Sequence, residues 1–320
     1  MNQEHEITIA DIEMAADRIR SQIIRTPLIP NDYISKEMNA DVYFKAESLQ
    51  HEGSFKIRGA TNAVMSLTDE QSATGVIAHS SGNHAAALAR ASSRRNLNAT
   101  LVMPHNSSPR KIQSVRKYGI EPVFCEPSSE ERQATTDQLI QRTRAHLIHA
   151  YDDPNVIAGQ GTVGLEMLEQ LHHIDAILVP VGGGGLLSGV LLAVKTLKPG
   201  IHVWGCEPAL ADDAKRSLDA GSIQTPERYD TVADGLRTAL GEITFPIIKN
   251  LVDGILLVTE TEILEATRKL VTDAKLVAEP SGAVTLAALS RYREHFRNQS
   301  VAVVISGGNM DLGNCRLGNH

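Results

Sequence analysis

Short apolar segments that alternate with helical segments constrain the fold of this 320-residue chain more than any other feature. The strands predicted in this way are 41–47, 75–79, 100–104, 122–125, 176–181, 203–206 and 301–305. The intervening stretches have the apolar spacing of helices, among them 58–67 and 161–171. Alternating strands and helices with short connections form parallel sheets that helices cover on both faces. We therefore predict an α/β fold of two open lobes, with a break near residues 152–154.

Composition and charge exclude several classes of protein. The chain has 42% apolar residues, enough for a large core, but only 4% aromatic residues to stack on nucleobases. Its net charge of −7 gives no basic surface for phosphate backbones. No apolar run reaches the roughly 18 residues that span a bilayer, and residues 1–19 lack the apolar core of a signal peptide. We expect a soluble protein that binds neither nucleic acid nor a membrane.

The cysteines are widely spaced and contain no CxxC pair. They are Cys125, Cys206 and Cys315. An odd number of isolated cysteines suits neither a disulfide framework nor a zinc site. Because such thiols persist in a reducing compartment, we expect a cytoplasmic protein.

Lys56 is the first candidate catalytic residue. It stands between Phe55 and Ile57, and a second cation, Arg58, follows two residues later. Apolar neighbours and a nearby positive charge disfavour the ammonium form. They lower the pKa of the lysine and make its amine a nucleophile that can form a Schiff base. The segment alone also fits a surface lysine whose stem lies along apolar residues.

Three strand ends run into polar turns that contain glycine, at 80–84, 182–185 and 306–309. In open α/β sheets, ligands bind at the carboxyl ends of strands, where helix N-termini present free N–H groups. Four consecutive glycines at 182–185 let the backbone wrap closely around a phosphate. A dinucleotide site or a tight turn also uses such a run, but the G-x-G-x-x-G pattern fits it poorly.

Together these features match the needs of pyridoxal phosphate and an amino-acid carboxylate: a lysine for an imine, a phosphate loop, an anion-binding helix start and a hydroxyl. The motifs resemble those of fold-type II pyridoxal-phosphate enzymes, in the branch of serine/threonine dehydratases and serine racemases. They are Ser54-Phe55-Lys56-Ile57-Arg58-Gly59-Ala60, Ser80-Ser81-Gly82-Asn83-His84, Gly182-Gly183-Gly184-Gly185-Leu186 and Ser306-Gly307-Gly308-Asn309. The likeness extends from about residue 12 to residue 312.

The resemblance implies a fold like that of the tryptophan synthase β subunit, with the cofactor between two open α/β lobes whose sheets are mainly parallel. Residues 1–74 and 153–320 would form a large cofactor-binding domain, and residues 75–152 a small mobile domain.

The resemblance also implies cofactor contacts. Lys56 would form the Schiff base and act as a base on one face of Cα. Phe55 would pack on the pyridine ring and Asn83 would bond its phenolic oxygen. Ser306 would face the ring nitrogen or, alternatively, cap a helix. A hydroxyl supplies no charge to a pyridinium, which favours β-elimination over transamination. The phosphate would be held by Gly182, Gly183, Gly184 and Gly185.

Ser81 is the most discriminating position in the resemblance. Many threonine dehydratases have alanine there, whereas serine racemases and 3-hydroxyaspartate dehydratases have a hydroxyl. Racemisation requires a second acid/base on the opposite face of Cα, which Ser81 would supply unless it is only a helix cap. The residues implied around the substrate are Ser80, Ser81, Gly82, His84, His79 and Arg132. Arg132 would clamp a second carboxylate or, alternatively, belong to a surface ion pair.

An acidic loop follows the predicted strand 203–206. Two carboxylates and a backbone carbonyl, from Glu207, Asp213 and Ala211, suit a hard cation with waters completing its shell. These positions resemble the metal site of the racemases, which implies Mg²⁺, with Ca²⁺ or Mn²⁺ as alternatives. Without the resemblance, solvated acidic side chains are the ordinary interpretation.

We predict a pyridoxal-phosphate-dependent lyase, amino-acid racemase or both. Its substrate would be a small hydroxy amino acid: serine, threonine or 3-hydroxyaspartate would give a 2-oxo acid and ammonia, and serine would be racemised. A homodimer is usual in the family and is expected here. The alternatives are an NAD-dependent dehydrogenase that uses the glycine run and a catalytically silent amino-acid-binding relative.

Overall fold

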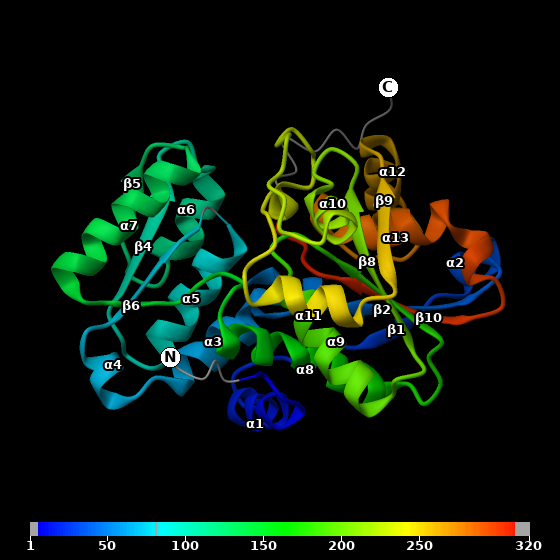
Figure 1. Cartoon of the computed structure of the whole chain (residues 1–320), viewed down its shortest axis with the longest axis horizontal. Helices are drawn as coiled ribbons and strands as arrows, with labels where there is room; N and C mark the ends of the chain where they lie inside the picture. Colours follow the sequence, from blue (N-terminus) through cyan, green and yellow to red (C-terminus); the bar gives the residue numbers. More distant parts are fainter. Residues whose placement is uncertain (1–5, 81, 311–320) are drawn as a thin grey trace.

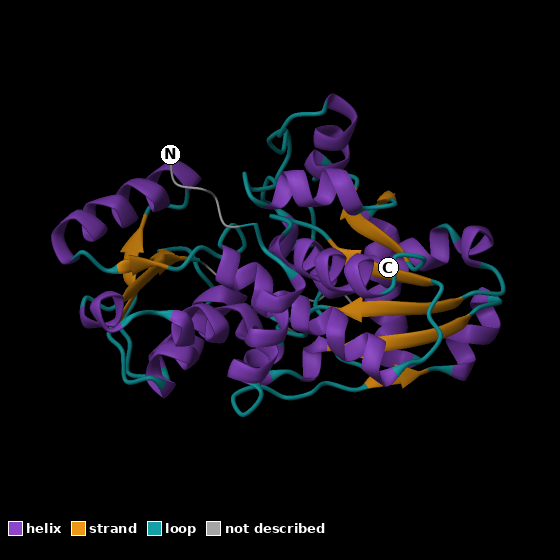
Figure 2. Cartoon of the chain, turned by 60° about the horizontal axis from the view of Figure 1, so that its bottom comes forward, coloured by secondary structure: helices purple, strands orange, loops and turns teal. Residues whose placement is uncertain are grey.

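The computed structural model describes residues 6–80 and 82–310 and contains two sheets (Figures 1 and 2). The larger sheet has six strands, in which β1 and β2 are antiparallel and all other neighbours are parallel. In spatial order they are β1 (Leu28–Pro30), β2 (Asp41–Ala46), β10 (Ser300–Ile305), β7 (Ala176–Pro180), β8 (His202–Pro208) and β9 (Gly254–Val258).

The smaller sheet has four strands, all parallel, and forms the lobe at the left of Figure 1. In spatial order they are β5 (Val123–Cys125), β4 (Ala99–Pro104), β3 (Val76–His79) and β6 (His146–Leu147). These strands come from one continuous stretch of the chain, which leaves the larger sheet after β2 and returns to it at β7. The predicted α/β class with mainly parallel sheets is confirmed. The domain boundaries at residues 74/75 and 152/153 stay a prediction.

Helices connect and cover the strands. The α-helices of the described residues are α1 (Ile9–Ile19), α2 (Asp32–Met38), α3 (Lys56–Ser66), α4 (Asp69–Ala73), α5 (Asn83–Arg94), α6 (Pro109–Arg116), α7 (Ser129–Thr143), α8 (Pro154–Gln170), α9 (Gly185–Leu197), α10 (Asp213–Ala220), α11 (Thr244–Leu251), α12 (Glu260–Thr272) and α13 (Pro280–Arg291). Short 3₁₀ turns are η1 (Glu47–Leu49), η2 (His51–Gly53), η3 (Asp234–Leu236) and η4 (Arg293–Phe296).

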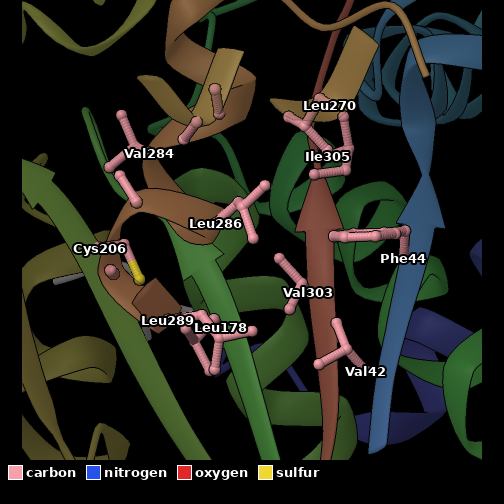
Figure 3. Packing of buried hydrophobic residues seen from close by; sticks show 14 of the residues in the cluster. Val42, Phe44, Leu178, Cys206, Leu270, Val284, Leu286, Leu289, Val303 and Ile305 are labelled. Carbon is pink, nitrogen blue, oxygen red and sulfur yellow. The ribbon is translucent and has the colours of Figure 1, made fainter. Parts of the chain in front are cut away.

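Alternation along the strands builds a core on each face of the larger sheet. In β10, Val303 and Ile305 pack with α2, α12 and α13, as Figure 3 shows for part of this cluster. Ala302 and Val304 of the same strand pack on the opposite face with α8 and α9. Successive side chains of a strand point to opposite faces, so a central strand covered on both sides must be apolar throughout. All six residues of β10 are buried.

The smaller sheet is covered in the same way. Ala78 of β3 and Leu101 of β4 pack with α3, α5 and α6, whereas Ile77 of β3 and Val102 of β4 pack with α7. The helix α3 therefore lies between the two sheets, and its first residue is Lys56.

Two helix starts differ from the prediction. The helix expected from 58 begins at Lys56, and the one expected from 161 begins at Pro154. Asp153 caps α8 by accepting the backbone N–H groups of Asn155 and Val156, and Pro154 fits the first helical position because it lacks an N–H. Strands β1, β6 and β9 were not predicted.

None of the helices in the described residues is long and apolar enough to cross a membrane. Cys125 and Cys206 are buried free thiols, and Cys315 lies outside the described residues.

Candidate active site

Lys56 is placed by contacts between its own segment and the end of β10. Ser54 and Gly307 form an isolated antiparallel bridge, and the N–H of Phe55 donates to the carbonyl of Ser306 at 3.0 Å. Ser306 is buried at the carboxyl end of β10, in the centre of the larger sheet. The turn predicted at 306–309 therefore lies against the lysine segment, as a shared site requires.

The amine of Lys56 has the properties of a nucleophile. Its Nζ donates to the carbonyl of Ala150 at 2.8 Å and lies 5.1 Å from the centre of the Phe55 ring. Burial lowers the pKa of Lys56 to about 8. The predicted direction is correct, but the predicted contribution of Arg58 is wrong. The Arg58 guanidinium is paired with Glu47 and Glu166, and burial alone accounts for the low pKa.

The glycine run connects β7 to α9, and each of its four residues is buried. A Cβ on Gly183 would lie 2.4 Å from the ring of Tyr151, and a Cβ on Gly182 would lie 3.0 Å from the Cα of Leu236. Gly184 has φ of +89°, which side chains disfavour. The glycines thus let this loop pack closely against Tyr151 and Leu236 at the start of a 13-residue helix, where free N–H groups favour a phosphate.

Tyr151 and Ala150 link the glycine run to the lysine. The carbonyl of Ala150 accepts the hydrogen bond from Lys56, and the next residue, Tyr151, lies over Gly183. Asp152 then accepts N–H groups of Glu242 and Ile243 at 3.0 and 2.9 Å, which fastens this segment to the start of α11.

Asn83, the first residue of α5, lies in a polar network with a carboxyl group that the sequence did not indicate. Its amide nitrogen donates to Glu279 at 2.7 Å, and its oxygen accepts from Asn309 at 2.9 Å. Burial, with the charge of Asp234, raises the pKa of Glu279 to about 7. A Cβ on Gly307 would lie 2.3 Å from Glu279, so this carboxyl group also borders the turn after β10.

Three neutral imidazoles line the same region. His84 has Nε2 3.0 Å from the carbonyl of Ile148, its Nδ1 has no partner among the described residues, and burial with the charge of Lys56 lowers its pKa to about 3. His149 Nδ1 accepts the N–H of Asp152 at 2.9 Å, and burial with the charge of His79 lowers its pKa to about 4. The rings of His79 and His149 are 6.1 Å apart. His149 was not among the predicted site residues.

The other residues predicted around the substrate lie at the carboxyl end of β3, at the start of α5 and in α7. Ser80 accepts the N–H of Gly82 at 3.2 Å, immediately before α5. Burial and then the charge of Arg132 lower the pKa of His79, so the guanidinium lies near this imidazole. Ser81 lies outside the described residues.

Two buried carboxyl groups occupy the predicted metal position. Glu207 accepts the N–H groups of Ala214 and Lys215 at 2.9 and 3.1 Å, whereas neither oxygen of Asp213 accepts a hydrogen bond from another described residue. Burial raises the pKa of Asp213 to about 7 and that of Glu207 well above its usual range, where the charge of Asp213 adds to the effect. Ala211 is buried beside them. The described residues contain no cluster of three or more His, Cys, Asp or Glu side chains suited to a metal.

A cavity of about 530 Å³ borders the polar network of Asn83, Glu279 and Asn309. Arg110 and Lys111 also line it. Its volume is that of a pocket for a small molecule.

Comparisons with known proteins agree with this geometry. The family model described as "Pyridoxal-phosphate dependent enzyme" matches residues 19–307. Serine racemase of Dictyostelium discoideum is 45% identical, over 96% of each chain. The beta-hydroxyaspartate dehydratase of Paracoccus denitrificans is 42% identical, over 95% of this chain and 97% of the relative. The solved structure of maize serine racemase superposes with a TM-score of 0.94 at 40% identity, covering 97% of this chain and 95% of that one.

Proposed function

The chain belongs to the pyridoxal-phosphate-dependent enzyme family, and we propose that it racemises serine and removes water from small β-hydroxy amino acids. One observation carries the proposal: a buried lysine amine with a depressed pKa lies in the segment that pairs with the end of β10 and is linked to the glycine run through Ala150 and Tyr151. Near full-length similarity to a serine racemase and a beta-hydroxyaspartate dehydratase supports these substrates over others.

The residues present fit the cofactor. A Cβ on Gly182, Gly183, Gly184 or Gly185 would lie 3.0 Å or less from a neighbouring protein atom, so only glycine fits this loop, whose backbone would hold the phosphate. Lys56 would bind the aldehyde carbon, Phe55 would pack on the ring, Asn83 would bond the ring hydroxyl and Ser306 would face the ring nitrogen. When bound, pyridoxal phosphate supplies the electron sink that stabilises negative charge at Cα of the substrate.

The chain's own groups would move the protons. The Lys56 amine takes the Cα proton on one face, because its low pKa leaves it partly neutral near pH 8. The hydroxyl of Ser81 returns a proton on the other face when serine is racemised. Glu279, whose pKa of about 7 allows either protonation state, accepts a hydrogen bond from Asn83 and so fixes the side chain that would bond the ring hydroxyl.

The substrate carboxylate would be bound by Ser80, Gly82 and His84 at the start of α5. Because burial lowers the pKa of His79, His84 and His149, these imidazoles are neutral at pH 7. Arg132 then provides the positive charge on this side and would clamp the second carboxylate of 3-hydroxyaspartate.

The proposal also includes a Mg²⁺ site, a homodimer, a cytoplasmic location and a mobile small domain. Glu207 and Asp213 would bind Mg²⁺ with the carbonyl of Ala211, which accounts for two carboxylate oxygens of Asp213 without a donor among the described residues. The protein would be a cytoplasmic homodimer. Residues 75–152 would move as a small domain against residues 1–74 and 153–320.

The first test incubates the purified protein with L-serine, pyridoxal phosphate and Mg²⁺. We expect D-serine, measured by chiral chromatography, to form at a rate comparable to that of pyruvate. Ser81→Ala should lose D-serine formation and retain more of the pyruvate, because elimination needs the second proton donor less than racemisation does. Pyruvate without D-serine would make the protein a dehydratase only, and 3-hydroxyaspartate and threonine would follow as substrates.

The alternatives predict different results in the same assay. A nicotinamide-dependent dehydrogenase would have no visible chromophore, and the match to the family model speaks against it. A catalytically silent relative would release no 2-oxo acid from any hydroxy amino acid.

Capture of pyridoxal phosphate by the cofactor-free protein should depend on pH with a midpoint near 8. Only the neutral amine attacks an aldehyde, and burial lowers the pKa of Lys56 to about 8, whereas an ordinary lysine titrates near ~10.4. The rate therefore rises from pH 6 to pH 9 and then levels off. Stopped-flow absorbance measures it, and a peptide with an acetylated N-terminus and one exposed lysine serves as the reference. A rate that still rises steeply above pH 10 would contradict the prediction.

A further inference from the structure

On the side of α3 that faces away from the Lys56 amine lies a buried charge cluster formed by Lys45, Glu47, Arg58 and Glu166. Lys45, Glu47 and Arg58 have no exposed surface, and Glu166 is 8% exposed. Two cations and two carboxylates balance in charge. They come from β2, η1, α3 and α8, so the cluster joins elements far apart in the sequence.

Every donor of the cluster has a defined acceptor. Arg58 binds Glu47 through Nε and Nη2, both at 2.8 Å, and binds Glu166 through Nη1 and Nη2 at 2.7 and 2.8 Å. The three protons of the Lys45 ammonium go to Glu166 at 2.6 Å, the carbonyl of Thr26 at 2.7 Å and Gln170 at 3.0 Å. Arg58 thus uses its planar fork twice, which a lysine cannot do.

Stability alone does not explain such a cluster. Taking ions out of water costs several kcal/mol each, and apolar residues of similar volume often give an equally stable core. Apolar contacts allow several orientations of a helix, whereas an arginine with two bidentate contacts allows one orientation of the helix that carries it.

Because Lys56 and Arg58 lie on the same turn of α3, fixing the side chain of Arg58 also fixes the direction of Lys56. Residues two apart on an α-helix point about 200° away from each other. Arg58 points into the cluster, so Lys56 points to the opposite side, toward the carbonyl of Ala150. The backbones of α3 and α8 also touch, because a Cβ on Gly159 would lie 2.6 Å from the Cα of Gly59.

We propose that Arg58 is a positioning residue: its double bidentate contact with Glu47 and Glu166 sets the rotation of the first turn of α3, and thereby aims the Lys56 amine at the cofactor aldehyde. The inference rests on the proposed Schiff-base role of Lys56. It assigns to Arg58 no contact with cofactor or substrate.

Arg58→Lys tests orientation separately from charge. It keeps the positive charge but loses the two bidentate contacts with Glu47 and Glu166. Arg95→Met is the matched control. Arg95 also holds α3, but at its other end, where it donates to the carbonyls of Val64 and Leu67. Both variants weaken α3, and only the first releases the turn that carries Lys56.

The test measures capture of pyridoxal phosphate by the cofactor-free full-length proteins, followed by borohydride reduction and peptide mapping. For Arg58→Lys we expect labelling of Lys56 to slow by about tenfold to a hundredfold, the range that a misplacement of about 1 Å produces. The midpoint pH of capture should rise above 8, because a loosened turn exposes the amine to water. Arg95→Met should lose thermal stability to a similar degree and keep the wild-type rate and midpoint.

The outcomes are distinguishable. If borohydride fixes pyridoxal phosphate to a residue other than Lys56 in the wild-type protein, both the proposed role of that lysine and this inference are overturned. If Lys56 is labelled in the wild-type protein, and Arg58→Lys has the same labelling rate and the same midpoint pH of capture as the wild type, the positioning role alone is overturned. If Arg58→Lys does not fold, Glu47→Gln, which removes one fork partner and keeps the volume, must show the slower labelling. Wild-type behaviour of a folded Glu47→Gln would also overturn the inference.

Discussion

Lys56→Ala should abolish the visible absorbance of the protein with pyridoxal phosphate and reduce its activity on L-serine by about 10³-fold or more. The substitution removes the amine that would bind the aldehyde and the base that would take the Cα proton, and general acid–base catalysis alone contributes up to ~10⁴-fold. The fold should survive, since the amine makes one hydrogen bond within residues 6–80 and 82–310, to Ala150, and its ammonium form is disfavoured by burial. Absorbance spectra, pyruvate release and thermal unfolding of the same preparation measure the three effects.

Lys56→Arg is the matched control for charge and length. A guanidinium does not lose its proton in proteins and forms no Schiff base, so this variant should be as inactive as the alanine variant. Addition of a small primary amine should restore part of the elimination activity to Lys56→Ala, because it replaces the missing base. It should restore less to Lys56→Arg, where the arginine side chain occupies the space that the lysine vacates. Activity within tenfold of wild type in either variant would exclude Lys56 as the catalytic amine.

The parts of the site that could be predicted from the sequence are those in which one short segment carries the whole signal. Lys56 lies between apolar residues, and the glycines at 182–185 follow a strand, so local spacing is enough to indicate both. The structure brings these two segments together through Ala150 and Tyr151.

Residues that reach the site through tertiary packing gave no such signal. Glu279 precedes Pro280 at the start of α13 and reads as an ordinary acid at a helix N-terminus. Its importance comes from burial and from its hydrogen bond to Asn83, a residue almost two hundred positions away in the chain. His149 likewise follows the two-residue strand β6, which is too short for a periodic pattern.

Arg58 shows how a neighbour in sequence misleads about chemistry. Its closeness to Lys56 suggested an electrostatic effect on the lysine, but the helix turns its side chain to the opposite side, where two carboxylates neutralise it. The pKa of Lys56 falls because the amine is buried, a property that depends on the assembled lobes. Helix α8 is a similar case on the level of the fold, since its apolar spacing suggested a start at 161, whereas Asp153 caps it and the helix begins seven residues earlier, at Pro154.

Mg²⁺ should stabilise the protein against unfolding at pH 8 and much less at pH 5. A ligand at about 100 times its Kd adds ~2.7 kcal/mol, which corresponds to roughly 5 °C or more in Tm. The pH dependence follows from Asp213, whose pKa burial raises to about 7 in the folded protein, above its usual 3.8. Without a cation, the folded state therefore holds a proton that the unfolded state releases, and stability falls as pH rises from about 4 to about 7. A cation replaces that proton, so its benefit grows over the same interval.

Glu207→Gln combined with Asp213→Asn should remove both the Mg²⁺ effect and the fall in stability with pH, since neutral amides neither titrate nor bind a hard cation well. Asp212→Asn is the matched control, because Asp212 lies next in the chain but pairs with Arg216 at 2.8 Å. It should keep the wild-type difference between Mg²⁺ and EDTA. Calorimetric unfolding at pH 5 and pH 8 with either additive decides the matter. Equal stabilisation by Mg²⁺ in the double variant and the wild type would place the cation elsewhere. If Mg²⁺ does not stabilise the wild type at pH 8, the Mg²⁺ site is excluded.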